Sequence, residues 1–210
     1  MIYLIGGPPR CGKTTLAKAL SKKLGIPWIS CDTLEVVSSE YVSFNQWRKM
    51  HPYSLLRKKY KTNDRFYRVL PTRMIVNVLK RQARPTFPAI EAVAICEIKD
   101  GNDYIIEGYH VDPAFVSCLM KKYGAKNFKA VFLGKKDAEK FAQDVHKSTT
   151  PNDWLLRATK REETFLKVGQ MVALYSNYFE REARKYGFPM ILMDEQFEKQ
   201  IDSILKSFIL

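Results

Sequence analysis

The first fifteen residues, MIYLIGGPPRCGKTT, decide the fold that the rest of the sequence has to complete. Gly7 to Thr14 spell G-x-x-x-x-G-K-T, the pattern of a phosphate-binding loop. Residues 2–5 form a short apolar run typical of a buried strand, and residues 14–24 carry apolar side chains at helical spacing. The motif therefore lies between a strand and a helix, as in a phosphate-binding loop. This setting favours such a loop over the alternative, a Gly-Pro turn followed by an incidental Lys-Thr.

The loop residues suggest how a polyphosphate would be bound. Gly7 and Gly12 let the backbone turn with its N–H groups pointing inward, and the following helix adds the positive end of its dipole. Lys13 is expected to reach the β- and γ-phosphates, and the Thr14 hydroxyl to ligate Mg²⁺. Cys11 is expected to fill space, because no feature of the sequence indicates a lowered thiol pKa. The predicted nucleotide-binding residues are Gly7, Pro8, Pro9, Arg10, Cys11, Gly12, Lys13, Thr14 and Thr15.

Residues 1–24 resemble the phosphate-binding loop of P-loop kinases, the adenylate-kinase-like group of small phosphotransferases. The resemblance implies ATP and Mg²⁺ as cofactors and an α/β P-loop NTPase fold of three layers. It also implies a five-stranded parallel sheet in the order 2-3-1-4-5. The run from Ile105 to His110, Ile-Ile-Glu-Gly-x-His, resembles the corresponding segment of 2-phosphoglycerate kinase-like proteins.

Five short apolar segments alternate with helical ones along the chain, which favours a three-layer α/β domain. The later strands are expected at residues 28–31, 104–107, 128–133 and 188–193. Helices are expected at 54–70, 72–83, 89–99, 111–123, 136–145 and 195–208, with one long helix from Asn152 or Asp153 toward Gly187. We expect one domain over 1–210, a helical acceptor-binding insertion over 34–100 and a lid-like segment over 146–162.

Composition favours a cytoplasmic protein. No stretch approaches the roughly 20 apolar residues that a membrane helix requires, and the N-terminus has no basic lead-in or cleavage site. The four cysteines, Cys11, Cys31, Cys96 and Cys118, show neither C-x-x-C spacing nor paired histidines. Reduced thiols and no membrane partner are therefore expected.

Positive charge is concentrated in one segment. The chain carries a formal charge of +13, and residues 48–84 contain twelve cations against one acid, a net charge of +11. Cations interleaved with aromatic side chains can bind nucleic acid. A solvated face over buried aromatics and a site for an anionic small acceptor are the alternatives, and the sequence leaves all three open.

Acidic residues follow the second and third strands. By resemblance to small-molecule P-loop kinases, Asp32 is the candidate base that takes the proton from the acceptor hydroxyl. Glu107 is expected to hold Mg²⁺, through water, or the acceptor. The alternatives are a helix cap for Asp32, and a cap or salt bridge for Glu107. His110 is expected at the surface or in packing.

Arg157 and Arg161 are four residues apart at the start of the expected long helix, so they would share one face. Arginines between the fourth and fifth strands resemble the lid of P-loop kinases, which closes over ATP and neutralises charge on the transferring group. Ordinary helix salt bridges with Glu162 and Glu163 are the alternative.

Three functions follow from these features. The leading one is an ATP- and Mg²⁺-dependent phosphotransferase acting on a small metabolite, nucleoside or nucleotide. A polynucleotide-end kinase using the basic segment is the first alternative, and a nucleotide-hydrolysing switch or assembly factor is the second. The sequence does not specify the acceptor, the nucleotide base or the oligomeric state.

Overall fold

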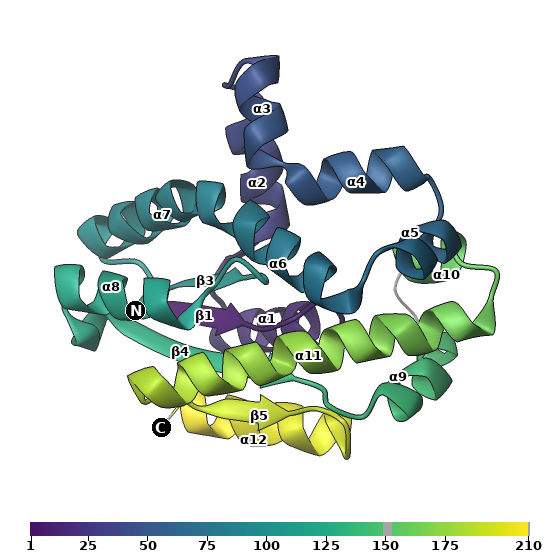
Figure 1. The fold of residues 1–210 in the computed structure, drawn as a ribbon. Helices are drawn as coiled ribbons and strands as arrows, with labels where there is room; N and C mark the ends of the chain where they lie inside the picture. Colours follow the sequence, from purple (N-terminus) through teal and green to yellow (C-terminus); the bar gives the residue numbers. More distant parts are fainter. Residues whose placement is uncertain (149–152, 210) are drawn as a thin grey trace.

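A computed structural model describes residues 1–148 and 153–209 as a sheet covered by helices (Figure 1). The strands are β1 (Ile2–Gly6), β2 (Trp28–Ser30), β3 (Tyr104–Glu107), β4 (Phe128–Gly134) and β5 (Met190–Leu192). The helices up to β3 are α1 (Lys13–Leu24), α2 (Cys31–Ser39), α3 (Phe44–Met50), α4 (Pro52–Tyr60), α5 (Asn63–Val69), α6 (Thr72–Ala83) and α7 (Phe87–Asp100). Those after β3 are α8 (Pro113–Tyr123), α9 (Ala138–Asp144), α10 (Trp154–Arg157), α11 (Glu162–Tyr186) and α12 (Phe197–Ile209). Short 3-10 turns are η1 (Arg84–Thr86), η2 (Ala125–Asn127) and η3 (Val145–Lys147).

The described residues form one five-stranded sheet in the order β2-β3-β1-β4-β5, with every pairing parallel. This confirms the expected strand order. Ile5 on β1 and Ser30 on β2 both pair with Glu107 at the end of β3. The carboxyl ends of the three strands therefore meet at one edge, where ligands bind in open α/β sheets.

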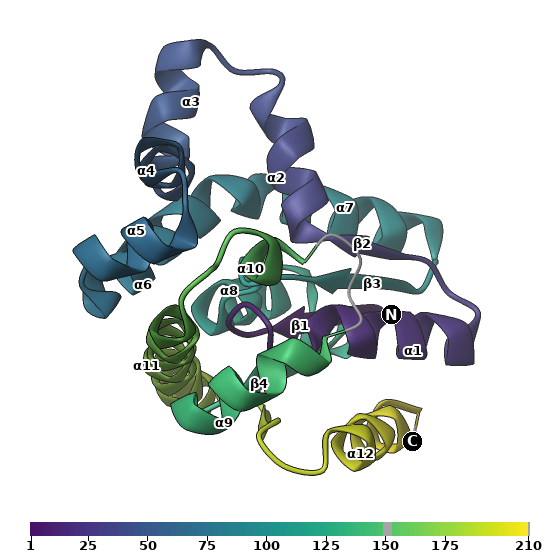
Figure 2. The ribbon, with the colours of Figure 1, turned by 90° about the vertical axis from the view of Figure 1, so that its right-hand side faces the viewer.

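Helices cover both faces of the sheet, which gives three layers (Figures 1 and 2). Helices α7, α8 and α11 pack on one face, and α1 and α12 pack together on the other. Strands β1 and β4 are almost entirely buried, as expected for parallel strands covered on both sides. The core of the domain therefore lies directly beneath the phosphate-binding loop.

Six helices, α2 to α7, connect β2 to β3, and α3 projects furthest from the sheet (Figure 2). The prediction of a single helix over residues 54–70 is wrong, because the helical conformation is interrupted between α4 and α5. Lys61 there adopts φ of 62°, and the Thr62 side chain accepts the N–H of Arg65 as the cap of α5. The basic segment is thus distributed over several short helices rather than one face.

The single long helix expected from Asn152 or Asp153 is also wrong. Asn152 lies outside the described residues, and Asp153 caps the short helix α10, which ends at Arg157. Helix α11 begins at Glu162 after a non-helical connection. Asp64 on α5 accepts the backbone N–H groups of Lys160 and Arg161 in that connection, and thereby satisfies donors that a continuous helix would have used.

No helix within the described ranges is both long and apolar enough to cross a membrane. All four cysteines are free thiols: Cys11 and Cys31 are buried, whereas Cys96 and Cys118 are exposed.

Candidate active site

The phosphate-binding loop connects β1 to α1 and depends on two glycines. Gly7 has φ of 131° and Gly12 has φ of 90°, in the region that favours glycine. A Cβ on Gly7 would lie 2.1 Å from the carbonyl oxygen of Leu133, and a Cβ on Gly12 would meet the Phe197 ring. The loop is therefore held against β4 and α12, and α1 begins directly behind it. This arrangement suits phosphate binding by N–H groups and the helix dipole.

Lys13 folds back across this loop. Its side chain is buried, and Nζ donates to the carbonyl oxygen of Pro8 at 2.6 Å. The ammonium group thus lies within the turn that would surround a phosphate group. Burial raises the pKa of the Cys11 thiol to about 11, against the opposing charge of Lys13. Cys11 is therefore a protonated packing residue at neutral pH, not a nucleophile.

Thr14 and Glu107 join the loop to the end of β3. Thr14 Oγ1 donates to Glu107 Oε1 at 2.9 Å. Burial raises the pKa of Glu107, and this effect exceeds the opposing ones of Lys13 and Thr14. A divalent cation would compensate a buried carboxylate of this kind, and hydroxyl and carboxylate oxygens are ligands that Mg²⁺ prefers. The two side chains therefore fit the metal of an ATP site.

The remaining ligands of such a metal would come from outside the protein. Among the described residues, no group of three or more His, Cys, Asp or Glu side chains is placed to hold a metal ion. Magnesium commonly uses one or two protein ligands together with substrate phosphates and water. The pair formed by Thr14 and Glu107 is consistent with that mode of binding.

Asp32 lies on the first turn of α2. Residue 31 was expected in the strand, but β2 ends at Ser30, whose hydroxyl accepts the Asp32 N–H at 3.2 Å. The Asp32 side chain is 76% exposed. Burial raises the pKa of the neighbouring Cys31 well above its ordinary value, and Glu107 and Asp32 both add to this rise. The two carboxylates therefore act on the same small region at the ends of β2 and β3.

Glu35, one turn beyond Asp32, was not singled out by the sequence. It accepts hydrogen bonds from His51 Nδ1 (2.9 Å), Gln82 Nε2 (2.7 Å), Tyr109 Oη (3.0 Å) and His110 Nε2 (2.6 Å). Burial acts to raise the pKa of Glu35, but these donors outweigh it, and the net pKa lies below its ordinary value. Glu35 is thus an ionised carboxylate whose hydrogen bonds join α2 to the turn between α3 and α4, to α6 and to the β3–α8 connection.

His110 is fully buried and bonded to Glu35, not at the surface. Two sequence features bear on this pair: Glu35 follows Asp32 by one helical turn, and His110 ends the Ile105–His110 run. Neither feature indicates which residues meet, because about 75 residues separate the two partners.

Arg10 in the loop is paired with Asp153 at the start of α10. Arg10 Nη1 lies 2.5 Å from Asp153 Oδ2, and Arg10 has φ of 63°. Of the lid-like segment expected over 146–162, residues 149–152 lie outside the described part of the chain. The Arg10–Asp153 pair fixes α10 beside the phosphate-binding loop.

Arg157 and Arg161 do not share one helical face, contrary to the expectation, because α10 ends at Arg157. Both are exposed, and Arg161 Nη1 donates to Glu163 at 3.0 Å. The connection between them is fastened to α5. Asn63 Nδ2 donates to Thr159 Oγ1 within this connection at 2.9 Å, and to the carbonyl oxygens of residues 154 and 155 before it. Asp64 accepts the Thr164 hydroxyl after it at 2.7 Å.

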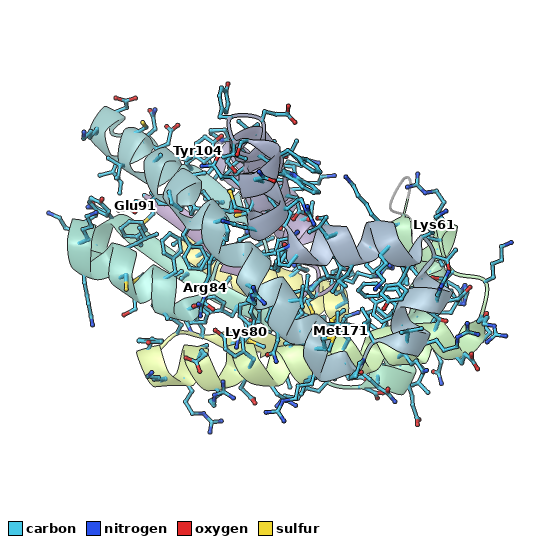
Figure 3. All side chains as sticks on the ribbon, turned by 45° about the horizontal axis from the view of Figure 1, so that its top comes forward. Lys61, Lys80, Arg84, Glu91, Tyr104 and Met171 are labelled. Atoms are coloured by element: carbon cyan, nitrogen blue, oxygen red, sulfur yellow. The ribbon has the colours of Figure 1, made fainter. Side chains whose placement is uncertain are left out.

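A cavity of about 510 Å³ lies between α6, α8 and α11. Lys80 near the end of α6 and Arg84 at the start of η1 lie beside each other, next to α11 (Figure 3). The aromatic part of the lining comprises Phe87, Tyr109, Phe115, Tyr175 and Tyr178, and the charged part comprises Lys80, Arg84, Asp112, Arg181 and Glu182. Tyr109 belongs both to this lining and, through its hydroxyl, to the hydrogen bonds around Glu35.

The cavity has more unpaired positive than negative charge. Asp112 accepts the Tyr178 hydroxyl at 2.6 Å and caps α8, and Glu182 accepts Arg181. Within the described ranges, Lys80 and Arg84 form no ion pair. Burial lowers the pKa of Lys80, whose ammonium lies 3.8 Å from the centre of the Tyr178 ring. Among the described residues, an anionic group entering the cavity would meet two cations that no carboxylate pairs with.

Comparison with known proteins finds similar sequences over part or all of the chain. A family model described as "ATPase family associated with various cellular activities (AAA)" matches residues 3–67. A 2-phosphoglycerate kinase from Pyrococcus horikoshii is 25% identical over 216 residues, which cover 100% of this chain and 65% of the relative. A 2-phosphoglycerate kinase from Pyrococcus furiosus is 24% identical over 211 residues, with 100% and 64% covered. The chain therefore spans just under two thirds of the length of these relatives.

Solved structures give the same fold. A shikimate kinase from Bacteroides thetaiotaomicron matches with a TM-score of 0.51 at 16% identity, covering 100% of this chain and 99% of the other. The chain has a P-loop kinase fold. In this chain, Asp32 on the first turn of α2 and Glu107 at the end of β3 lie at the sheet edge that carries the phosphate-binding loop, and the helices between β2 and β3 provide one wall of the cavity.

Proposed function

We propose that the protein is an ATP- and Mg²⁺-dependent phosphotransferase that moves the γ-phosphate to a hydroxyl or phosphate group of a small molecule. The observation that carries this proposal is the hydrogen bond between Thr14 and Glu107 beside the buried Lys13. It brings a phosphate-binding loop and a buried carboxylate into direct contact. The kinase names of the full-length relatives support the same reaction class.

On the donor side, the N–H groups of the loop and Lys13 would bind the polyphosphate, with Pro8, Pro9 and Thr15 completing the loop. Thr14 and Glu107 would hold Mg²⁺, which would neutralise the charge that develops on the transferred phosphoryl group. Arg157 and Arg161 would approach the transferring group from the lid-like segment. Arg157 lies on α10, which the Arg10–Asp153 ion pair attaches to the phosphate-binding loop.

On the acceptor side, Asp32 would take the proton of the attacking hydroxyl. The acceptor would lie across helices α6 and α8, with an anionic group directed to Lys80 and Arg84. The cavity volume of about 510 Å³ is in the usual range for a small-molecule site. Residues 34–100 would then be the acceptor-binding region, and 2-phosphoglycerate is the first acceptor to test, because the relatives are named for it.

The deciding experiment is a transfer screen with γ-labelled ATP and Mg²⁺. Pools of phosphorylated acids, other metabolites, nucleosides and oligonucleotides are offered separately, with Lys13→Met as the inactive control. Label on a small molecule supports the proposal. Free phosphate alone, unaffected by any acceptor, would instead support a nucleotide-hydrolysing switch or assembly factor.

A second candidate, a polynucleotide-end kinase, has one observation in its favour. At the projecting end of the insertion, Tyr41 is 85% exposed and Phe44 is 71% exposed. Arg48 lies over the Phe44 ring at 6.0 Å, and Lys49 is also exposed. Exposed rings beside cations can stack bases and bind phosphates. Single-stranded RNA should then bind at low salt and dissociate as salt rises; absence of binding at low salt removes this candidate.

A further inference from the structure

His110 lies between two carboxylates at the proposed acceptor site. Its Nε2 is 2.6 Å from Glu35 Oε2, and its Nδ1 is 3.9 Å from Asp32 Oδ1. The His110 side chain is 0% exposed, whereas Asp32 is 76% exposed. The imidazole therefore connects a buried carboxylate to one that solvent or a substrate can reach.

The surroundings of Glu35 determine which ring nitrogen of His110 carries a proton. Glu35 is ionised, since its pKa lies below the ordinary value, and an ionised carboxylate can only accept hydrogen bonds. His110 Nε2 must then be the donor of the 2.6 Å bond. In the neutral ring, Nδ1 consequently carries a lone pair. Among the described residues this buried nitrogen has no hydrogen-bond partner, and it lies on the Asp32 side of the ring.

We propose that His110 is a positioning residue that receives, through Asp32, the proton released by the acceptor. This inference rests on the proposed phosphotransferase function. As the acceptor O–H bond breaks, the proton passes to the Asp32 carboxylate, while the oxygen electron pair forms the bond to the γ-phosphorus. The bond from that phosphorus to the β,γ-bridging oxygen breaks, and its electrons remain on ADP. The exposed Asp32 side chain then turns toward the ring, which shortens the 3.9 Å separation to a hydrogen bond, and passes the proton to His110 Nδ1. The resulting imidazolium is held between two carboxylates.

Other titratable groups around His110 come from several elements. Cys31 and Asp32 lie on α2, His51 on the turn between α3 and α4, Glu107 at the end of β3, and Tyr109 beside His110 itself. Burial raises the pKa of Cys31 and of Tyr109 far above neutrality, so neither exchanges protons in the working range. His51 is directed to Glu35 through Nδ1, whereas His110 directs Nδ1 to Asp32, so the Nδ1 lone pair of the neutral His110 ring is the acceptor that faces this carboxylate.

His110→Gln and Gln82→Met provide a matched comparison. The glutamine amide in His110→Gln can still donate to Glu35 but offers no titrating nitrogen, whereas Gln82→Met removes another donor to Glu35, at 2.7 Å. Single-turnover transfer is measured between about pH 5.5 and 9. In His110→Gln we expect the transfer rate to fall about 10- to 100-fold while ATP affinity is retained. We also expect the midpoint of the acid limb of the pH–rate profile to shift by about 0.5 pH unit or more. In Gln82→Met the thermal stability falls while the limb stays in place.

Transfer within about two-fold of wild type in His110→Gln, or a lower rate with an unmoved acid limb, overturns the inference. A second measurement follows the C–H proton of His110 by NMR in the wild type and in Asp32→Asn, which is practical because the chain has three histidines. Sharing of a proton predicts a different titration midpoint in Asp32→Asn, and an identical midpoint contradicts it. If the wild type transfers no phosphate to any acceptor, the proposed function fails, and the NMR result alone decides the link between Asp32 and His110.

Discussion

Arg10 of the phosphate-binding loop and Asp153 at the cap of α10 form an ion pair of 2.5 Å, with Asp153 almost fully buried. Asp153 Oδ2 also accepts the Ser148 hydroxyl at 2.7 Å, and Oδ1 accepts the N–H of Leu155. One carboxylate thus fixes the position of α10 and the conformation of the loop. The consequences can be measured in stability as well as in nucleotide binding.

Asp153→Asn should lower the free energy of unfolding by about 1.5–3 kcal/mol at neutral pH, because a buried charged hydrogen bond is lost while the helix cap is kept. Burial acts to raise the pKa of Asp153, but the bonds from Arg10 and Ser148 outweigh it, and the net pKa is below the ordinary 3.8. A depressed pKa stabilises the folded state above pH 3.8, and this contribution is lost as the pH falls through the folded-state value.

The difference in unfolding free energy between wild type and Asp153→Asn should therefore be constant from about pH 8 to 5 and shrink below about pH 4. Urea titrations across this range measure it. Asp137→Asn is the control, because Asp137 is an exposed cap of α9. A gap between wild type and Asp153→Asn that stays constant down to pH 2 would contradict this account.

Lys13→Met should weaken ATP binding or turnover by about 10²- to 10³-fold, as expected when one charged donor to a phosphate is removed. Lys22→Met is the matched control, because it makes the same charge change on an exposed position of α1. Calorimetric titration with ATP separates the two variants. Equal affinities in both would show that Lys13 does not contact the nucleotide.

Glu107→Gln should abolish most of the gain in nucleotide affinity that Mg²⁺ provides, because the neutral amide is a poor ligand for a hard cation. Affinity for ATP without metal should change little. Titrations with ATP in EDTA and with ATP in excess Mg²⁺ give the two values for each protein. An unchanged Mg²⁺ effect would remove Glu107 from the metal site and leave it as a structural partner of Thr14.

Arg84→Met should raise the KM for an anionic acceptor by about 10- to 100-fold while leaving the Kd for ATP unchanged, because a charged hydrogen bond to the acceptor is lost. Arg73→Met makes the same charge change at an exposed position on α6. It should leave both constants near wild type. If the two variants have the same effect, overall positive charge rather than the cavity governs acceptor binding.

The sequence predicted the position of the phosphate-binding loop from a local pattern: an apolar strand, a glycine loop and a helix. The sheet order was expected from the resemblance to P-loop kinases, and the structure confirms it. The sequence did not predict the break at Lys61, where a left-handed backbone interrupts a helical pattern, or the end of α10 at Arg157. Both breaks depend on bonds to distant segments. Asp64, for example, satisfies N–H groups almost a hundred residues away.

In the candidate site, too, the local motif could be predicted from the sequence, whereas the contacts between distant residues could not. Lys13 and Thr14 are consecutive in a motif that can be read directly. Glu35 and His110 are separated by 75 positions, and only the parallel sheet brings the two segments together. The sequence predicted that two acids, Asp32 and Glu107, would lie near the phosphate-binding loop where β2 and β3 end. It did not predict which side chains would form hydrogen bonds around these strand ends.

The hydrogen bonds that Asn63 and Asp64 form with residues 154–164 attach α5 to the segment that carries Arg157 and Arg161. A displacement of α5 would therefore carry Arg157 with it. Helix α10 is also attached to the phosphate-binding loop through Arg10 and Asp153. The basic insertion and the nucleotide loop are thus linked through one intervening helix.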